Sequence, residues 1–287
     1  MGELLFVGLG LTDERDLSLR AVDLLRGCRK VFLEEYTSRS APGTRDRLEA
    51  LLGHPVEPLD RAAVESETPL LRALASEGTV ALVVVGEPFA ATTHVSLRLA
   101  AEDRGHRWRV LHNASILTAG PSLSGLSLYK FGRTCSLPVP RENYRPRSPY
   151  ETLSANTRAG SHSLVLLDLD PAASRYLTAP EALRLLASLE AEWGEGVLPP
   201  GRRVVALARV GSEGARVVVG PWETVAQADL GPPLHALILP GEPLHFIEED
   251  ALARWEGSPP GPPKGPRGLP DPLPRRGPPV TPDGGRP

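Results

Sequence analysis

The sequence predicts a mixed α/β protein with two domains and a C-terminal tail. In the first half, short apolar runs alternate with stretches of helical periodicity, a pattern typical of a mainly parallel sheet covered on both faces. In the second half, neighbouring apolar runs joined by a Gly-containing turn predict antiparallel strands. We expect an N-terminal α/β domain over residues 1–113, a C-terminal α/β domain over residues 114–256 and a disordered Pro/Gly-rich tail over residues 257–287.

The strands expected in the first half are short runs of apolar residues, as buried parallel strands require. They cover residues 4–7, 31–33, 54–59, 80–85 and 108–111. The clearest helix follows the first strand, because Leu19, Val22 and Leu25 recur at helical spacing and Gly27 suits a C-cap. Further helices are expected over residues 44–52 and 62–75 and from Val95 onward.

The rhythm of strands and helices restarts after a turn at residues 112–117, which leads through Gly120 and Pro121, so the domain boundary is placed there. The strands expected beyond it cover residues 134–137, 163–168, 203–209, 215–219 and 235–239. Thr178, with Pro180 in the first turn after it, predicts the start of a helix that runs to about residue 193. Other helices are expected over residues 150–159 and 246–255.

Composition argues against several classes of protein. A formal net charge of -3 with interleaved signs is unlike a dedicated nucleic-acid binder, which usually carries a basic face. No apolar run approaches the roughly 20 residues of a membrane span, and the N-terminus lacks a signal-peptide pattern. Cys28 and Cys135 fit no metal or redox spacing, so reduced thiols in a cytoplasmic protein are expected.

The tail after Glu256 is dominated by proline and glycine with scattered arginine. Such a segment cannot bury enough apolar area to offset the entropy of ordering it, so we expect disorder or local polyproline conformation. Arg275 and Arg276 leave contact with RNA or a partner as the alternative to a solubilising tail, which is favoured.

The glycine loop after the first strand invites a dinucleotide-binding interpretation. Gly8 and Gly10 stand between a strand and a helix, and Glu34 ends the second strand. The full fingerprint requires glycine at position 13, where this chain has Asp13, and an acidic residue there opposes a diphosphate. We therefore expect a ligand that approaches the backbone closely but carries no diphosphate.

The strand at residues 80–85 leads into a Gly-Pro corner and then a polar turn, Gly86-Glu87-Pro88 to Thr92-Thr93-His94. Ligands of α/β proteins gather outside the carboxyl ends of strands, which makes this corner a candidate wall of a binding site. An ordinary strand-to-helix loop is the alternative, since turn residues punctuate every fold.

Other strand ends carry polar residues, each with a purely structural alternative. Ser115 can be a helix N-cap, Asp168 a turn residue and His235 a histidine with one satisfied hydrogen bond. The chain has no GxSxG elbow, no HExxH and no cysteine with a plausible catalytic partner, which argues against hydrolase and zinc chemistry. The remaining loops predict a ligand recognised through backbone amides and carbonyls.

A family resemblance combines these segments. GLGLTDERDLSLRA, FLEEYTS, GEPFAATTH, HNASI, LYKFG, LLDLD, LARVGS and GPPLHALILPG resemble, in that order, segments of the diphthine synthase family. That family belongs to the tetrapyrrole-methylase-like methyltransferases that use S-adenosyl-L-methionine. The resemblance covers residues 3 to about 256, and only the Pro-rich tail lies outside it.

The resemblance implies a two-domain tetrapyrrole-methylase-like fold with S-adenosyl-L-methionine in the cleft between the domains, and a homodimer. It implies successive methylation of the amino group of the 3-amino-3-carboxypropyl-histidine on translation elongation factor 2, which gives diphthine in diphthamide biosynthesis. Archaeal-type members stop at the trimethylated amine, whereas eukaryotic-type members add a methyl ester. The sequence does not choose between these outcomes.

The resemblance also implies site residues. Carried over by motif, the cofactor contacts are Leu11, Glu87, Ala90, Ser115, Ile116, Leu167, Val210 and His235. Candidates for handling the substrate are Tyr36, Thr92, Thr93, His94 and Lys130, and no metal ligand is expected. The family usually has Asp where this chain has Glu87, and a small residue where it has Ala90. Asn113 receives no role.

No catalytic residue is assigned, because methyl transfer from a sulfonium is an in-line displacement in which positioning supplies much of the rate. A free α-amino group has a pKa of about 7.7–8.0, so part of it is already neutral near neutral pH. Two alternatives stay open: a corrin or porphyrin methyltransferase of the same architecture, and a non-catalytic cofactor-binding module.

Overall fold

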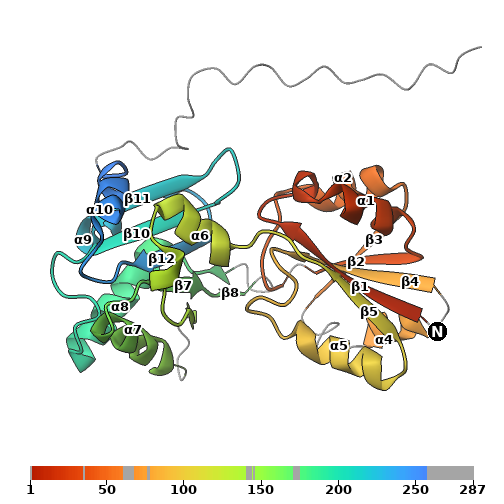
Figure 1. Cartoon of the computed structure of the whole chain (residues 1–287), viewed down its shortest axis with the longest axis horizontal. Coiled ribbons are helices and arrows are strands. Elements are labelled where there is room, and N and C mark those ends of the chain that lie inside the picture. Colours follow the sequence, from red (N-terminus) through yellow and green to blue (C-terminus); the bar gives the residue numbers. More distant parts are fainter. Residues whose placement is uncertain are drawn as a thin grey trace, which may run out of the picture.

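The computed structural model of the protein describes residues 2–34, 36–60, 68–75, 78–139, 144, 146–170 and 175–256. The Pro-rich tail and part of the helix expected over residues 62–75 lie outside the described residues. Within them, the chain forms two lobes, each built around its own five-stranded sheet (Figure 1).

The first sheet is parallel throughout and has the strand order β3-β2-β4-β1-β5. Its strands are β1 (Gly2–Gly10), β2 (Lys30–Glu34), β3 (Val56–Leu59), β4 (Gly78–Val85) and β5 (Arg107–Leu111). The alternation of strands and helices predicted this parallel sheet, and the prediction is confirmed.

Helices cover both faces of the first sheet (Figure 1). They are α1 (Leu19–Arg26), α2 (Thr44–Leu52), α4 (Thr68–Leu74) and α5 (His94–Asp103), with a short 3₁₀ helix η1 (Glu14–Asp16). Alternate residues of β1 enter different cores: Leu5 and Val7 pack with α1 and α2, whereas Leu4 and Phe6 pack with α4 and α5. Burial on both faces explains why these strands are continuously apolar in sequence.

The second sheet is mixed, with the order β11-β10-β12-β7-β6. Its strands are β6 (Cys135–Leu137), β7 (Ser163–Leu167), β10 (Arg203–Ala208), β11 (Arg216–Pro221) and β12 (His235–Leu239), beside the small pair β8 (Leu169–Asp170) and β9 (Arg175–Tyr176). Only β6 and β7 pair in parallel among these five; β12 runs antiparallel to β7 and β10, and β10 and β11 form the predicted hairpin. The second half therefore differs from the first as the sequence predicts.

The helices of the second lobe also form two layers (Figure 1). They are α6 (Ile116–Ser124), α7 (Ser148–Arg158), α8 (Ala179–Trp193), α9 (Trp222–Val225) and α10 (Phe246–Ala253), with the 3₁₀ helix η2 (Leu128–Lys130). One core joins α7 and α8 to one face of the sheet, and a second core joins α6 and α10 to the other. The division of the chain at residues 113 and 114 stays a prediction.

Helix α6 is absent from the sequence prediction, which treats Gly120 and Pro121 as turn residues. Both lie inside the helix and are buried. A Cβ on Gly120 would lie 3.2 Å from Leu207 Cδ1, so the missing side chain lets α6 approach the sheet. Packing of this apolar helix outweighs the backbone hydrogen bond that proline removes.

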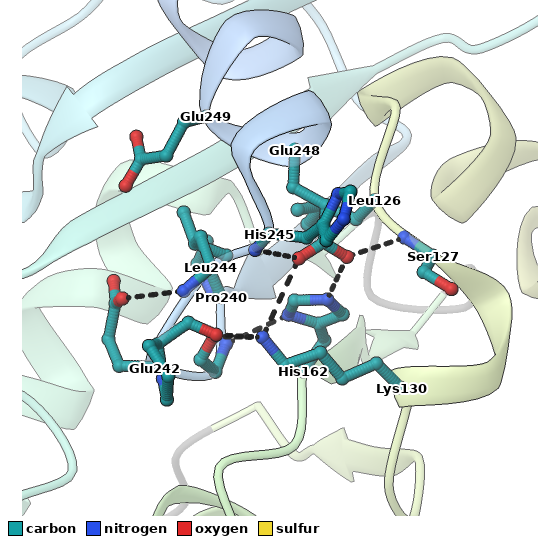
Figure 2. A network of polar contacts seen from close by, with 12 residues as sticks. Leu126, Ser127, Lys130, His162, Pro240, Glu242, Leu244, His245, Glu248 and Glu249 are labelled. Carbon is teal, nitrogen blue, oxygen red and sulfur yellow. Dashed lines mark hydrogen bonds and ion pairs between the residues drawn. The ribbon is translucent and has the colours of Figure 1, made fainter.

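A buried polar network fixes α10 to the second lobe (Figure 2). The Glu248 carboxylate accepts hydrogen bonds from Ser127 N (2.9 Å), His245 N (2.9 Å) and His162 Nε2 (2.9 Å). Burial opposes its ionisation, but these hydrogen bonds hold the pKa of Glu248 at about 2. Lys130 Nζ lies 3.5 Å from the same carboxylate.

This network predicts an acid-sensitive stability. Because the pKa of Glu248 is lowered from 4.5 to about 2, its stabilisation is complete above about pH 4.5 and is lost as the pH falls toward 2. Glu248→Gln should lower the free energy of unfolding by about 3 kcal/mol at pH 7, and this deficit should shrink as the pH falls through that window.

Urea unfolding of both proteins across the pH range measures the deficit. Glu249→Gln is the matched control, because Glu249 is half-exposed, points away from the network in Figure 2 and pairs only with Arg203 in the described structure. A deficit for Glu248→Gln that stays constant with pH would contradict the role of its charge.

Candidate functional site

Three loops meet at the carboxyl edge of the first sheet. β1 lies between β4 and β5, and all three strands run in the same direction. The loop after β4 returns to the end of β1, where Gly86 N donates to Gly10 O at 2.7 Å. The segments after β1, β4 and β5 therefore share one edge, the usual position of ligand sites in α/β sheets.

Glycines allow these loops to touch through their backbones. A Cβ on Gly8 would lie 2.6 Å from Gly86 O and 2.7 Å from Asn113 Cβ. Gly10 has φ +98°, and a Cβ there would lie 2.5 Å from Asp16 Cβ. Side chains at these positions would separate the strand ends, so the glycines keep the edge closed.

Glu87 and Asn113 tie the three loops together. The Glu87 carboxylate accepts from Asn113 N at 3.0 Å and lies 2.8 Å from His112 Nδ1. Asn113 Nδ2 donates to Gly8 O and to Asp16 O, both at 3.0 Å. The sequence assigned Asn113 no role, and the structure shows that it links the ends of β1 and β5.

Two backbone amides in the loop after β1 are bound by carboxylates of the same loop. Asp16 Oδ2 accepts from Thr12 N at 2.7 Å and from Thr12 Oγ1 at 2.8 Å. Asp13 Oδ1 accepts from Arg15 N at 3.0 Å, and hydrogen bonds from the Arg15 side chain lower the pKa of Asp13. A diphosphate needs such amides free, so this loop is unsuited to one.

Ser115 and Ile116 begin α6. Ser115 is its N-cap, with Oγ accepting from Leu117 N at 3.3 Å, and Ile116 packs against the core of the second lobe. A Cβ on Gly86 would lie 3.5 Å from Ser115 Cβ, so the Gly-Pro corner touches the start of this helix. Ser115 therefore lies beside the Gly-Pro corner, and Ile116 follows it into the second lobe.

Three predicted residues of the second lobe share one edge of its sheet. Because β12 is antiparallel to β7 and β10, its start lies beside their ends, with Ala236 opposite Leu166 and His235 opposite Ala208. Leu167 ends β7, and Val210 follows β10.

This second edge touches the first. A Cβ on Gly211, the residue after Val210, would lie 2.8 Å from Leu11 Cβ and 3.0 Å from Leu11 Cδ1. Leu11 comes directly after β1. The structure therefore brings the loops after β1 and β10 into contact, as a cofactor shared by both lobes would require.

The His235 imidazole is fully engaged within the protein. Its Nδ1 accepts from Ala179 N at 3.2 Å, so Nε2 carries the proton and donates to Pro232 O at 3.1 Å. Burial lowers the pKa of His235, which favours this neutral form. A hydrogen bond from His235 to a ligand would therefore have to come from its backbone.

Arg209 holds the two loops of the second edge together. Its backbone N donates to Leu234 O at 2.9 Å, and its guanidinium donates to Gly214 O at 3.1 Å and to Pro232 O. Arg209 and Ala91 are the non-glycine residues with left-handed backbone in the described structure, at φ 47° and 56°. Such strain concentrates at functional sites, and here it falls in one loop of each edge.

Three of the predicted substrate residues pack against the Gly-Pro corner or against one another beside it. Thr92 Oγ1 and His94 Nδ1 both donate to Pro88 O at 2.8 Å, and the Tyr36 ring meets His94 edge to face. His94 is fully buried, with Nε2 3.9 Å from the buried Glu34 carboxylate, so it supports the turn and touches no solvent.

Thr93 and Ala90 complete the corner. Thr93 occupies the N-cap position of α5 and is exposed. Ala90 N donates to Glu87 O at 3.1 Å, which closes the turn that precedes it.

Lys130 lies apart from the other predicted site residues, so its role in handling the substrate stays a prediction. Lys130 Nζ donates to Gly241 O at 2.9 Å and to Pro243 O at 2.5 Å, both beyond the end of β12. It therefore lies at the opposite end of the second sheet from His235. Its ammonium is bound by carbonyls that the sequence motif does not reveal.

Metal and thiol chemistry find little support in the part of the chain that the structure describes. No group of three or more His, Cys, Asp or Glu side chains there could hold a metal ion. Burial raises the pKa of Cys28 to about 11 and that of Cys135 to about 12, which makes both thiols poor nucleophiles.

No described helix has the length and apolar character needed to cross a bilayer.

Comparisons with known proteins identify the family. A model of the tetrapyrrole (corrin/porphyrin) methylases matches residues 3–226. A diphthine synthase from Methanothermobacter thermautotrophicus is 41% identical over 257 residues, which covers 89% of this chain and 96% of that protein. A diphthine methyl ester synthase from Aspergillus fumigatus is 37% identical over 260 residues, 85% of this chain and 90% of its own.

Comparison with solved structures leads to the same family. A crystal structure of diphthine synthase matches with a TM-score of 0.80 and 32% identity, over 90% of this chain and 97% of that one. The chain therefore belongs to the tetrapyrrole methylase family and, within it, to the diphthine synthases. The resemblance expected from the sequence is confirmed, and the protein is a methyltransferase.

The close approach of the loops yields a stability prediction. Gly8→Ala should lower the free energy of unfolding by about 1–3 kcal/mol, because its Cβ would push against the Gly86 carbonyl and Asn113. Gly27→Ala is the matched control, since its Cβ would meet only Leu24 O at 3.5 Å. Chemical denaturation of both variants measures the difference, and equal stabilities would show that the edge accommodates a side chain.

Proposed function

We propose that the protein transfers methyl groups from S-adenosyl-L-methionine to the amino group of the 3-amino-3-carboxypropyl-histidine on translation elongation factor 2, giving diphthine. The observation that carries the proposal is the meeting of two loop edges, one from each sheet, at Leu11 and Gly211. The chain's membership in the diphthine synthase family supports methyl transfer as the reaction at these loops.

The residues proposed to hold the cofactor are Leu11, Glu87, Ala90, Ser115, Ile116, Leu167, Val210 and His235. Their surroundings suit a cationic ligand better than an anionic one, because the amides of Thr12 and Arg15 are bound by carboxylates of the chain itself. Glu87 adds a partly buried carboxylate at the same edge. S-adenosyl-L-methionine would supply an electrophilic methyl group on a positively charged sulfur.

The chain's own contribution is positioning. The Glu87–Asn113 link fixes the loops after β1, β4 and β5 relative to one another. Arg209 fixes the loops before β12 and after β10. Holding both edges rigid allows the amine and the methyl group to be aligned for in-line displacement, from which much of the rate comes.

We propose further that the enzyme acts in the cytoplasm as a homodimer. The dimer rests on the resemblance to the family, and the compartment rests on Cys28 and Cys135, which fit no metal or redox spacing. Size-exclusion chromatography with light scattering tests the dimer.

Methyl transfer tests the activity directly. Purified protein with labelled S-adenosyl-L-methionine should transfer label to elongation factor 2 that carries the aminocarboxypropyl group, and none to the unmodified factor. Mass spectrometry of the product counts the methyl groups and separates a trimethylated amine from an additional methyl ester. Label on a corrin or porphyrin instead, or cofactor binding with no transfer to any acceptor, would reject the proposal.

Glu87 provides a prediction about affinity. Glu87→Asp should bind S-adenosyl-L-methionine within about threefold of the parent, because a carboxylate is retained, whereas Glu87→Lys should bind at least about tenfold more weakly. Lysine cannot accept the hydrogen bond from Asn113 N and places a cation beside a cationic ligand. Isothermal titration calorimetry measures both constants, and unchanged affinity in Glu87→Lys would remove Glu87 from the site.

A further inference from the structure

His112 forms a dyad with Glu87 at the edge of the proposed site. It follows β5 directly, and its Nδ1 lies 2.8 Å from Glu87 Oε1. An ionised carboxylate only accepts hydrogen bonds, so with Glu87 ionised Nδ1 carries the proton of this hydrogen bond. In the neutral imidazole the lone pair is therefore on Nε2.

The Nε2 atom is available to a substrate. The His112 side chain is 71% exposed, whereas that of Glu87 is 18% exposed. No hydrogen bond from Nε2 to any described residue is present. In this dyad Nδ1 is hydrogen-bonded to the Glu87 carboxylate, whereas Nε2 is accessible to a ligand.

Hydrogen bonds to Glu87 and Asn113 fix the orientation of the dyad. The second Glu87 oxygen accepts from Asn113 N at 3.0 Å, and the Asn113 side chain is held by carbonyls of Gly8 and Asp16. The imidazole therefore rests on a carboxylate that is anchored to all three loops of the edge. A base held by a carboxylate through its other ring nitrogen is a recurring arrangement for proton transfer.

Other charged groups of these elements are turned to different partners. Arg109, on β5, lies 3.7 Å from Glu3. The Asp16 carboxylate, on η1, is bound to Thr12. Among the described residues, Glu87 is the charged group that faces His112.

We propose that His112 is the catalytic proton acceptor for the substrate amine, with Glu87 as its positioning residue. This inference rests on the proposed function, because the amine is the acceptor named there. An aliphatic amine is mostly an ammonium at neutral pH, and an ammonium has no lone pair with which to attack a methyl group.

The protons and electrons balance in each cycle. One N–H bond of the ammonium breaks, its proton passes to Nε2, and its electron pair stays on the amine nitrogen. That pair forms the new C–N bond, while the pair of the breaking C–S bond stays on sulfur. The resulting imidazolium is stabilised by Glu87, and its exposed Nε2 returns the proton to water before the next cycle. Three such cycles convert the primary ammonium into a trimethylated one.

His112→Asn separates this role from a structural one. The asparagine amide occupies the place of Nδ1 and can still donate to Glu87, but it has no basic nitrogen in place of Nε2. We expect kcat to fall about tenfold near pH 6.5, and we expect this deficit to shrink as the pH rises, because more of the amine is then neutral without help. The KM for S-adenosyl-L-methionine should stay unchanged.

His106→Asn is the matched control. His106 precedes β5 as His112 follows it, and its Nδ1 accepts from Gly2 N at 3.3 Å, at the opposite end of the strand. Its pH profile should match that of the parent. Full activity of His112→Asn at every pH, or a deficit that does not change with pH, would overturn the proposal.

A second measurement needs no turnover. Nitrogen-15 NMR of the free protein should show neutral His112 with the proton on Nδ1, and Glu87→Gln should weaken this preference. A proton on Nε2 in the parent would overturn the proposal even if methyl transfer is established. Failure of the parent to methylate the elongation factor would instead reject the proposed function and leave the NMR result standing.

Discussion

The contact between the ends of β1, β4 and β5 is the constraint on which the site depends. Gly8 permits it, because no side chain fits between the backbones of Gly86 and Asn113. Glu87 then has only a short distance to bridge to the segment after β5. A partly buried carboxylate bound by a backbone amide and an imidazole is costly to leave unpaired, so each part of this edge holds the others in place.

The two sheets reach the same arrangement by different routes. In the parallel sheet the carboxyl ends of three strands meet because all strands point the same way. In the mixed sheet the ends of β7 and β10 meet the start of β12 because the strands alternate in direction. Loops from both lobes can then surround one small molecule, and Gly211 against Leu11 marks where they touch.

The sequence predicts those parts of the fold that local patterns determine. Apolar runs gave the strands of both sheets, the spacing of Leu19, Val22 and Leu25 gave α1, and Thr178 gave the start of α8. Helix α6 was missed because residues that break isolated helices are accepted where packing is strong.

The candidate site was predictable only as a set of loops. The partners of Asn113 and His112 depend on strand order, which places β1 between β4 and β5, so that the loop after β4 reaches across the end of β1 to the segment after β5. No local pattern contains that order. Lys130 shows the same limit, since its carbonyl partners lie more than a hundred residues further along the chain.

The carboxylates of the first loop have a consequence for selectivity. Amides at the start of a βα unit ordinarily attract phosphate, and a cell offers nucleotides in abundance. Here Asp16 occupies the Thr12 amide and Asp13 occupies that of Arg15, as a permanently bound internal anion would. The loop keeps the compact backbone of a glycine turn, while its own carboxylates disfavour a phosphate at these two amides.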